Sequence, residues 1–220
     1  MDIGRAFSFV TEDEKWIMKV LIGGLVSLIP ILGTLAGMGY MFTVARNVYQ
    51  GQSQPLPSWD EFGQFLMRGL YAFVISLIYS IPLIILIFVP MLIILPLAGG
   101  SGSEDAAGAM VFLALCLNLF ILVISVVWSV LIYVAFVRYV QTDSLGDALN
   151  FGKVFSMLQA SLGTWVLLIV GIILASLASM IGLIGCGIGV IFTIFYAYIV
   201  MGHMMGQVAR KTDTSMGMML

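Results

Sequence analysis

Charged residues are scarce in this chain: only 9% of its 220 residues are Asp, Glu, Lys or Arg, whereas 61% are hydrophobic. A water-soluble domain carries about 25% charged residues, and a core of this size still leaves much of its surface in water. The composition therefore excludes an ordinary soluble domain. Residues 69–103, 106–137 and 154–209 contain no charged side chain, and each run is long enough for a membrane helix. We therefore predict an integral membrane protein.

Residues that carry catalysis and metal binding are equally scarce. The chain has one histidine, His203, and two cysteines that both lie in apolar sequence. A catalytic site needs a base, a partner group and a pocket, so we predict that the protein is not an enzyme and holds no cofactor. A net charge of −2 provides no basic field for nucleic acid. One alternative stays open, because the thioethers of Met201 and Met204 beside His203 could hold Cu(I).

A short amphipathic phrase recurs three times. It reads DIGRAFSFV, DEFGQFLMR and NFGKVFSML, starting at residues 2, 60 and 150. In each copy the apolar residues recur at helical spacing and the charged residues fill the other face, which is typical of a short helix in the membrane interface. We therefore predict that Phe7, Phe65 and Phe155 lie at the boundary of the lipid acyl chains.

Each phrase precedes apolar sequence that closes on TVAR, AFVR or QVAR. The repeated unit is therefore an interfacial helix, a membrane helix, a turn, a second membrane helix and an arginine. Three pseudo-repeats, residues 1–50, 58–140 and 145–211, form a single integral membrane domain over residues 1–220. The predicted fold is all-α: a polytopic transmembrane bundle of about six membrane helices in three pseudo-repeated hairpins, with amphipathic cytoplasmic interfacial helices.

Basic residues set the predicted orientation. With three hairpins, all nine Lys and Arg fall on one side of the membrane, and the positive-inside rule makes that side, with both termini, cytoplasmic. The stretch from Lys19 to Arg46 is short for two spanning helices. Residues 16–49 therefore form either a short hairpin or one long helix, and we favour the hairpin because Pro30 and Gly33 break helices.

Two sets of residues have predicted structural roles. Arginines at the ends of apolar stretches attract anionic lipid headgroups, and tryptophan favours the membrane boundary; the residues so assigned are Arg46, Arg138, Arg210 and Trp59. Glycines four apart let helices approach closely; these are Gly33, Gly37, Gly185, Gly189, Gly202 and Gly206.

Asn118 separates two hypotheses about function. It is the only amide near the middle of a span, and intramembrane polar residues mark transport paths, although a lone amide more often joins helices. A permease predicts a cavity that reaches mid-membrane near Asn118. An accessory protein predicts a solid interior packed through glycine.

The stretch VARNVYQGQSQPLPSWDEFGQF, with KVLIGGLVSLIPILG before it and GLYAFVISLIYSIPLIIL after it, resembles a prokaryotic membrane family known as domain of unknown function 4013. The resemblance is strongest over residues 10–95 and continues to about residue 210. The family looks related to the membrane domain that accompanies some glycerophosphodiester phosphodiesterases. The resemblance implies a multi-pass protein of a prokaryotic plasma membrane, and it implies no activity and no catalytic residues.

These observations lead to one functional hypothesis and one alternative. The favoured hypothesis is a non-catalytic structural or accessory membrane protein that organises lipid, assembles into an oligomer or docks a partner. The alternative is a permease or lipid-translocating protein for a small or apolar solute. Under either hypothesis, the expected partners of the protein are membrane lipids and either further copies of the chain, in a homo-oligomer, or another membrane protein.

Overall fold

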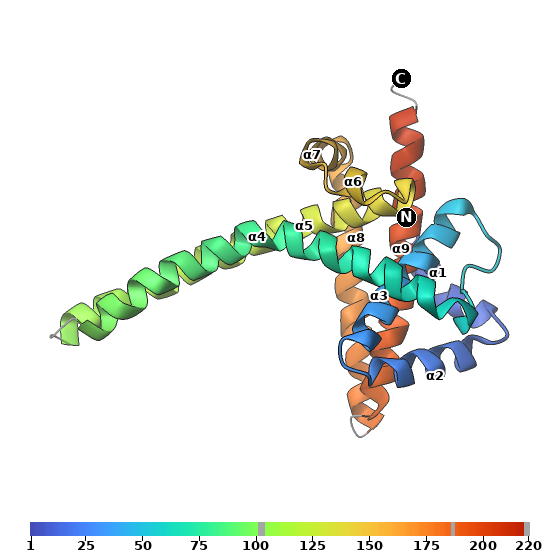
Figure 1. Cartoon of the computed structure of the whole chain (residues 1–220), viewed down its shortest axis with the longest axis horizontal. Coiled ribbons are helices and arrows are strands. Elements are labelled where there is room, and N and C mark those ends of the chain that lie inside the picture. Colours follow the sequence, from blue (N-terminus) through green and yellow to red (C-terminus); the bar gives the residue numbers. More distant parts are fainter. Residues whose placement is uncertain (101–103, 186–187, 218–220) are drawn as a thin grey trace. The chain divides into compact units, whose positions relative to one another are not determined.

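The computed structural model describes residues 1–100, 104–185 and 188–217, and every regular element in these ranges is a helix. The predicted all-α membrane fold is therefore confirmed. In chain order the elements are α1 Ile3–Ser8, η1 Phe9–Glu12, α2 Trp16–Ser27, α3 Leu32–Gln50, η2 Trp59–Glu61, α4 Phe62–Gly100, α5 Glu104–Thr142, α6 Leu145–Ala148, α7 Phe151–Ala160, α8 Leu162–Ser179, η3 Met180–Gly185 and α9 Ile188–Gly217 (Figure 1).

Four of the described helices are long and apolar enough to cross a membrane, so the predicted number of about six is approximate. The four candidate spans cover Trp59–Ile94, Gly108–Thr142, Leu162–Leu183 and Gly189–Thr214. The remaining pair of the predicted six corresponds to α2 and α3. Helix α2 has 12 residues and measures about 18 Å, which is well short of the hydrocarbon thickness of about 30 Å.

Residues 16–49 form a short hairpin and not one long helix. Helix α2 ends at Ser27 and α3 begins at Leu32, and Ile31 between them has a positive φ of 65°. Pro30 lies in this break, as the sequence predicted. Gly33 lies so close to the backbone of α2 that a Cβ would come within 2.8 Å of the Ser27 Cα, so the two helices fold back tightly on each other.

Each predicted pseudo-repeat contains one helical hairpin: α2 and α3, α4 and α5, or α8 and α9. Two compact units divide the described chain. Unit 1 comprises residues 1–75 and 134–220, and unit 2 comprises residues 76–133. The derivation of these hairpins from one ancestral repeat stays a prediction.

Unit 1 is built around α9. Helix α3 packs against it along a line of small residues, because Gly202 lies against Met41 of α3 and Gly206 lies against Ala45. The matching order of these contacts shows that α3 and α9 run in the same direction. Helix α8 covers another side of α9 (Figure 1). Gly171 of α8 lies against Met204 of α9.

The three recurring phrases adopt different structures. The first forms α1 and the third forms α7, whereas the second runs through η2 directly into α4 without a separate helix. Phe7 is half-buried and Phe155 is 52% exposed. Phe65 is fully buried by protein, so its predicted position at the lipid boundary is wrong. The interfacial placement of α1 and α7 stays a prediction.

A salt bridge fastens the link between α1 and α2. Asp13 Oδ2 lies 2.7 Å from Lys19 Nζ, which also donates to the carbonyl oxygen of Leu56 at 2.7 Å. The backbone amide of Lys15 donates to Asp13 Oδ1. Burial alone would raise the pKa of Asp13, but the hydrogen bonds and positive charges of Lys19 and Lys15 outweigh burial and hold this pKa below its usual value.

This pKa predicts acid sensitivity in the N-terminal part of the protein. Because the folded-state pKa of Asp13 is lower than its unfolded value of about 3.9, ionised Asp13 stabilises the fold above about pH 4 and this contribution disappears as pH falls through the folded pKa. We expect a loss below about 1 kcal/mol, since such pairs are partly exposed to water. Thermal unfolding of purified protein in detergent, followed from pH 6 to pH 3, measures it. Asp13→Asn should flatten the acid limb, and an unchanged limb would contradict this account.

Unit 2 is a hairpin formed by the distal parts of α4 and α5. Their 25–30 residues measure about 37–45 Å, enough to cross a bilayer. Pro82, Pro90 and Pro96 lie inside α4, where each proline lacks the amide hydrogen that a helix needs. The indole of Trp128 on α5 donates to the carbonyl oxygen of Tyr79 at 2.6 Å, so a side chain of α5 binds the backbone of α4 one turn before Pro82.

Candidate functional site

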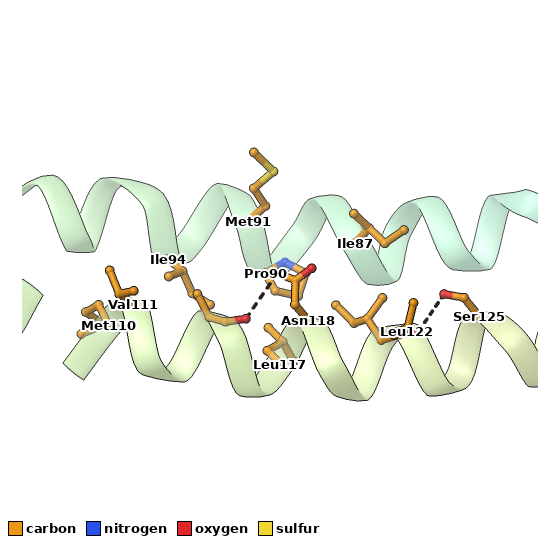
Figure 2. A pocket seen from close by; sticks show the side chains of 12 residues that line it. Ile87, Pro90, Met91, Ile94, Met110, Val111, Leu117, Asn118, Leu122 and Ser125 are labelled. Atoms are coloured by element: carbon orange, nitrogen blue, oxygen red, sulfur yellow. Dashed lines mark hydrogen bonds between the residues drawn. The ribbon is translucent and has the colours of Figure 1, made fainter. Parts of the chain in front are cut away.

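A groove of 440 Å³ lies between α4 and α5 in unit 2 (Figure 2). Its lining comes from both helices and is almost entirely apolar: Ile87, Pro90, Met91, Ile94, Met110, Val111, Ala114, Leu117, Asn118, Ile121, Leu122 and Ser125. Bulky side chains line most of its length, whereas Ala114 contributes a single methyl group and leaves space opposite α4.

Asn118 and Ser125 are the polar residues that line this groove, and they differ in their hydrogen bonds. Asn118 reaches from α5 towards Pro90 of α4 (Figure 2), and its Nδ2 donates to the carbonyl oxygen of Ala114 at 3.3 Å. Its Oδ1 accepts no hydrogen bond from the described residues. By contrast, the hydroxyl of Ser125 donates to Ile121 at 2.7 Å, so its donor is already satisfied within α5.

Pro90 lies on the opposite wall and has no amide hydrogen to donate. A proline inside a helix cannot donate to the carbonyl four residues earlier, here that of Leu86. Asn118 lies about 15 Å along α5 from Gly108, where the candidate span begins, so a bilayer about 30 Å thick with its boundary at Gly108 would have Asn118 near its middle. Polar groups are expensive to leave unpaired at this depth, so the groove suits an apolar molecule that also carries one hydrogen-bonding group.

The surfaces of α4 and α5 around the groove are not covered by other described parts of the protein. In each of the candidate spans in α4 and α5, only 6% of the most apolar stretch is buried by other parts of the protein. Leu92, Phe112 and Leu119 are each 65% exposed or more. Such extensive apolar surface requires lipid or another protein to cover it.

The arginines predicted to contact headgroups are in unit 1. Arg46 Nη1 lies 3.3 Å from Asp143 Oδ1, and Arg138 lies one turn before this aspartate on α5. The guanidinium of Arg210 packs against Gly51, directly after α3. Arg138 Nε is buried and has no hydrogen-bond partner among the described residues. The structure thus pairs Arg46 with the carboxylate of Asp143, and headgroup contact stays a prediction for all three arginines.

Trp59 belongs to an aromatic cluster that the sequence did not indicate. Its ring stacks on Tyr40 with centroids 5.0 Å apart and also contacts Phe65 and Phe195. Its indole donates to the carbonyl oxygen of Lys19 at 3.0 Å. Trp59 is therefore half-buried among helices α2, α3, α4 and α9, and its predicted place at the membrane boundary is untested.

The glycines predicted to pack helices differ in how tightly they are enclosed. A Cβ would overlap neighbouring backbone at Gly33, Gly189, Gly202 and Gly206. At Gly37 a Cβ would meet Tyr198 at 3.4 Å, an ordinary contact. The packing of Gly185 lies outside the described residues.

Two further glycines, Gly39 and Gly69, were missed by the sequence analysis. A Cβ at Gly39 of α3 would overlap the carbonyl oxygen of Phe65 in α4, and a Cβ at Gly69 of α4 would overlap that of Leu35 in α3. The backbones of α3 and α4 are therefore in direct contact at two places within unit 1. Neither glycine has a partner four residues away, so the spacing rule could not find them.

The three residues considered for copper face different neighbours. The ring of His203 stacks on Phe9 with centroids 4.1 Å apart, whereas the sulfur of Met204 packs against Gly171 of α8. Met201 is half-buried elsewhere on α9. Within the described part of the chain, no three His, Cys, Asp or Glu side chains are grouped in a way that could hold a metal ion.

Comparison with known proteins gives one match. A family model described as protein of unknown function (DUF4013) matches residues 22–188. No curated protein and no solved structure matches the chain. The resemblance to the membrane domain of glycerophosphodiester phosphodiesterases therefore stays a prediction.

Proposed function

Since the chain belongs to the family of proteins of unknown function DUF4013, whose description supplies no activity, we propose a function from the groove itself: a non-catalytic membrane protein that binds and organises membrane lipid. The observation that carries this proposal is the apolar groove between α4 and α5 with Asn118 inside it. An acyl chain would fill the apolar lining, and a hydroxyl or carbonyl group carried within the apolar part of the molecule would satisfy the free capacity of Asn118.

The shape of the groove favours lipid binding over solute transport. It runs between two neighbouring helices whose other surfaces are exposed, so a molecule could enter it sideways from the bilayer. Within unit 1, by contrast, glycines bring the backbones of α3, α4 and α9 into direct contact. In our proposal the protein lies in a prokaryotic plasma membrane with both termini in the cytoplasm, as the distribution of Lys and Arg supports. Lipid or a second copy of the chain covers the exposed surfaces.

A permease or lipid-translocating protein is the second candidate. The groove beside Asn118 is the cavity that the permease hypothesis predicted, whereas the glycine contacts of unit 1 are the packing that the accessory hypothesis predicted. Each candidate is therefore supported by one of the two features. The two candidates differ in one measurable property. Lipid organisation requires retention of lipid, whereas transport requires flux across a sealed vesicle.

A bulky residue in the groove tests the proposal. We expect Ala114→Trp to reduce labelling by a phospholipid that carries a photoreactive diazirine in mid-chain at least fivefold, because the indole would occupy the space beside Asn118. The matched control is Ala109→Trp, since Ala109 is exposed on the same helix and does not line the groove. Labelled peptides are identified by mass spectrometry after reconstitution in vesicles.

Two results would count against lipid binding in this groove. One is equal labelling of α5 in both variants. The other is labelling spread evenly over exposed residues such as Leu119, as expected of lipid that only surrounds the protein. Flux of lipid between leaflets that is lost in Ala114→Trp would instead support the translocation candidate.

A further inference from the structure

A second cavity, of 540 Å³, lies in unit 1 between α1, the segment that follows α3, and α9. Its lining contains four charged residues, Asp2, Arg5, Glu12 and Arg210, in contrast to the apolar groove of unit 2. Two carboxylates and two guanidiniums make this set electrically neutral overall. A cavity with separate charges of both signs suits a zwitterionic molecule better than a simple anion.

Hydrogen bonds between the two ends of the chain fix one polar group in this cavity. The backbone amide of Asp2 donates to Gln207 Oε1 at 2.6 Å, and Gln207 Nε2 donates to the carbonyl oxygen of Asp2 at 2.9 Å. The same Nε2 lies 3.0 Å from His203 Nδ1. The backbone amide of Asp2 is a donor, so the side-chain atom of Gln207 that faces it must be the oxygen Oε1. The amide nitrogen Nε2 of Gln207 then faces His203 and donates, so His203 Nδ1 must accept. The ring proton of His203 therefore lies on Nε2, as a donor.

The guanidiniums of Arg5 and Arg210 make no ion pair with any described carboxylate. Both line the cavity, and Arg210 is held in place against Gly51. Glu12 also lines the cavity and is exposed, with no cation in salt-bridge distance among the described residues. The cavity therefore offers two guanidiniums and two carboxylates without ion pairs among the described residues, and of the two carboxylates Asp2 already accepts the backbone amide of Arg5.

We propose that this cavity binds a phosphate ester that carries a primary ammonium group, the chemistry of an ethanolamine phospholipid headgroup. The guanidiniums of Arg5 and Arg210 bind the phosphate, since arginine forms paired hydrogen bonds to phosphate oxygens. His203 supplies a further donor, and Glu12 accepts hydrogen bonds from the ammonium group. The segment of α9 that lines the cavity lies near the end of the span Gly189–Thr214, where headgroups meet the protein.

This inference uses residues of unit 1 alone and stands whether or not the α4–α5 groove binds lipid. The experiment is native mass spectrometry of the full chain released from nanodiscs that contain equal amounts of phosphatidylethanolamine, phosphatidylcholine and phosphatidylglycerol. We expect the wild-type protein to retain phosphatidylethanolamine at least fivefold over the other two lipids. Phosphatidylcholine has the phosphate but its ammonium has no hydrogen to donate, and phosphatidylglycerol has no ammonium.

Three substitutions assign the binding to this cavity. Arg5→Gln should lower retained phosphatidylethanolamine at least fivefold, and Arg5→Lys should restore part of it. Lys15→Gln is the charge-matched control, because Lys15 is exposed and does not line the cavity. Glu12→Gln should remove the preference for phosphatidylethanolamine over phosphatidylglycerol while binding of phosphate persists. Because Glu12 is exposed, this variant keeps the test decisive even if Arg5→Gln fails to fold.

Soluble phosphoethanolamine distinguishes the two sources of this chemistry. Displacement of retained lipid only by millimolar concentrations of the soluble ester would assign the cavity to a membrane lipid, whereas displacement by micromolar concentrations would assign it to a soluble phosphate ester. Equal retention of all three lipids by the wild-type protein, Arg5→Gln and Glu12→Gln, without any effect of the soluble ester, would overturn the proposal.

Discussion

Replacing Gly39 with alanine is expected to prevent α3 and α4 from packing together, and so to abolish the folded protein. The single added methyl group would overlap the carbonyl oxygen of Phe65. Backbone atoms within two helices cannot move aside as a flexible side chain can. Overpacking a close contact costs about 1–3 kcal/mol and occasionally more, and we expect the upper end because the clash is with backbone. Gly69→Ala should act alike, since its Cβ would overlap Leu35.

The control for this prediction lies two residues away. Gly37→Ala places the same methyl group on the same helix, where it would meet Tyr198 at an ordinary 3.4 Å. We expect Gly37→Ala to be expressed and to elute as the wild-type protein does. The measurement is the yield of monodisperse protein by size-exclusion chromatography after extraction in mild detergent. Equal yields for Gly39→Ala and Gly37→Ala would show that α3 and α4 do not touch at Gly39.

Truncation of Tyr40 should have a similarly large effect. Its ring is fully buried and contacts Trp59, Phe65 and Phe195, while its hydroxyl donates to the carbonyl oxygen of Pro57 at 2.9 Å. Burial, and to a lesser degree the charge of Asp13, raises the pKa of this hydroxyl, so it remains a donor. Tyr40→Ala should therefore lower the free energy of unfolding by about 3–5 kcal/mol, the cost of removing a large buried aromatic ring.

Tyr40→Phe separates the ring from the hydroxyl. It keeps the aromatic contacts and loses only the hydrogen bond to Pro57, at a cost of about 1 kcal/mol. Thermal unfolding followed by tryptophan fluorescence measures both variants, because Trp59 stacks directly on Tyr40. Similar losses in Tyr40→Ala and Tyr40→Phe would mean that the hydroxyl, and not ring packing, stabilises this cluster.

Local sequence was sufficient to predict the break between α2 and α3. Pro30 and Gly33 both disfavour a continuous helix, and the structure places a positive φ at Ile31 between them. The membrane character and the three hairpins were likewise predictable, since they depend on the length of apolar runs. Asn118 was identified for the same reason, as an amide within an apolar stretch.

The tertiary contacts were not predictable in this way. The phrase that contains Phe65 resembles the first and third copies, yet Phe65 is buried because Tyr40, Trp59 and Phe195 meet above it from three other elements. The sequence of residues 60–68 alone does not predict these contacts, because Tyr40 and Phe195 lie far from it in the chain. Pro90 lies close to Asn118, although the two are 28 positions apart in the sequence. The cavity lined by Arg5 and Glu12 similarly requires α1 to return to α9, near the other end of the chain.

The shortness of α2 has a consequence for biosynthesis. The hairpin of α2 and α3 turns before it can cross a bilayer, and backbone that turns at such depth must be covered by protein. Its cover is α9, against which Gly23 and Gly206 mark the contacts of both helices. At about 5–20 residues per second, the ribosome delivers α9 many seconds after α3. The hairpin of α2 and α3 therefore cannot reach its final packing until α9 has been made, and until then the insertion machinery or lipid must cover its backbone.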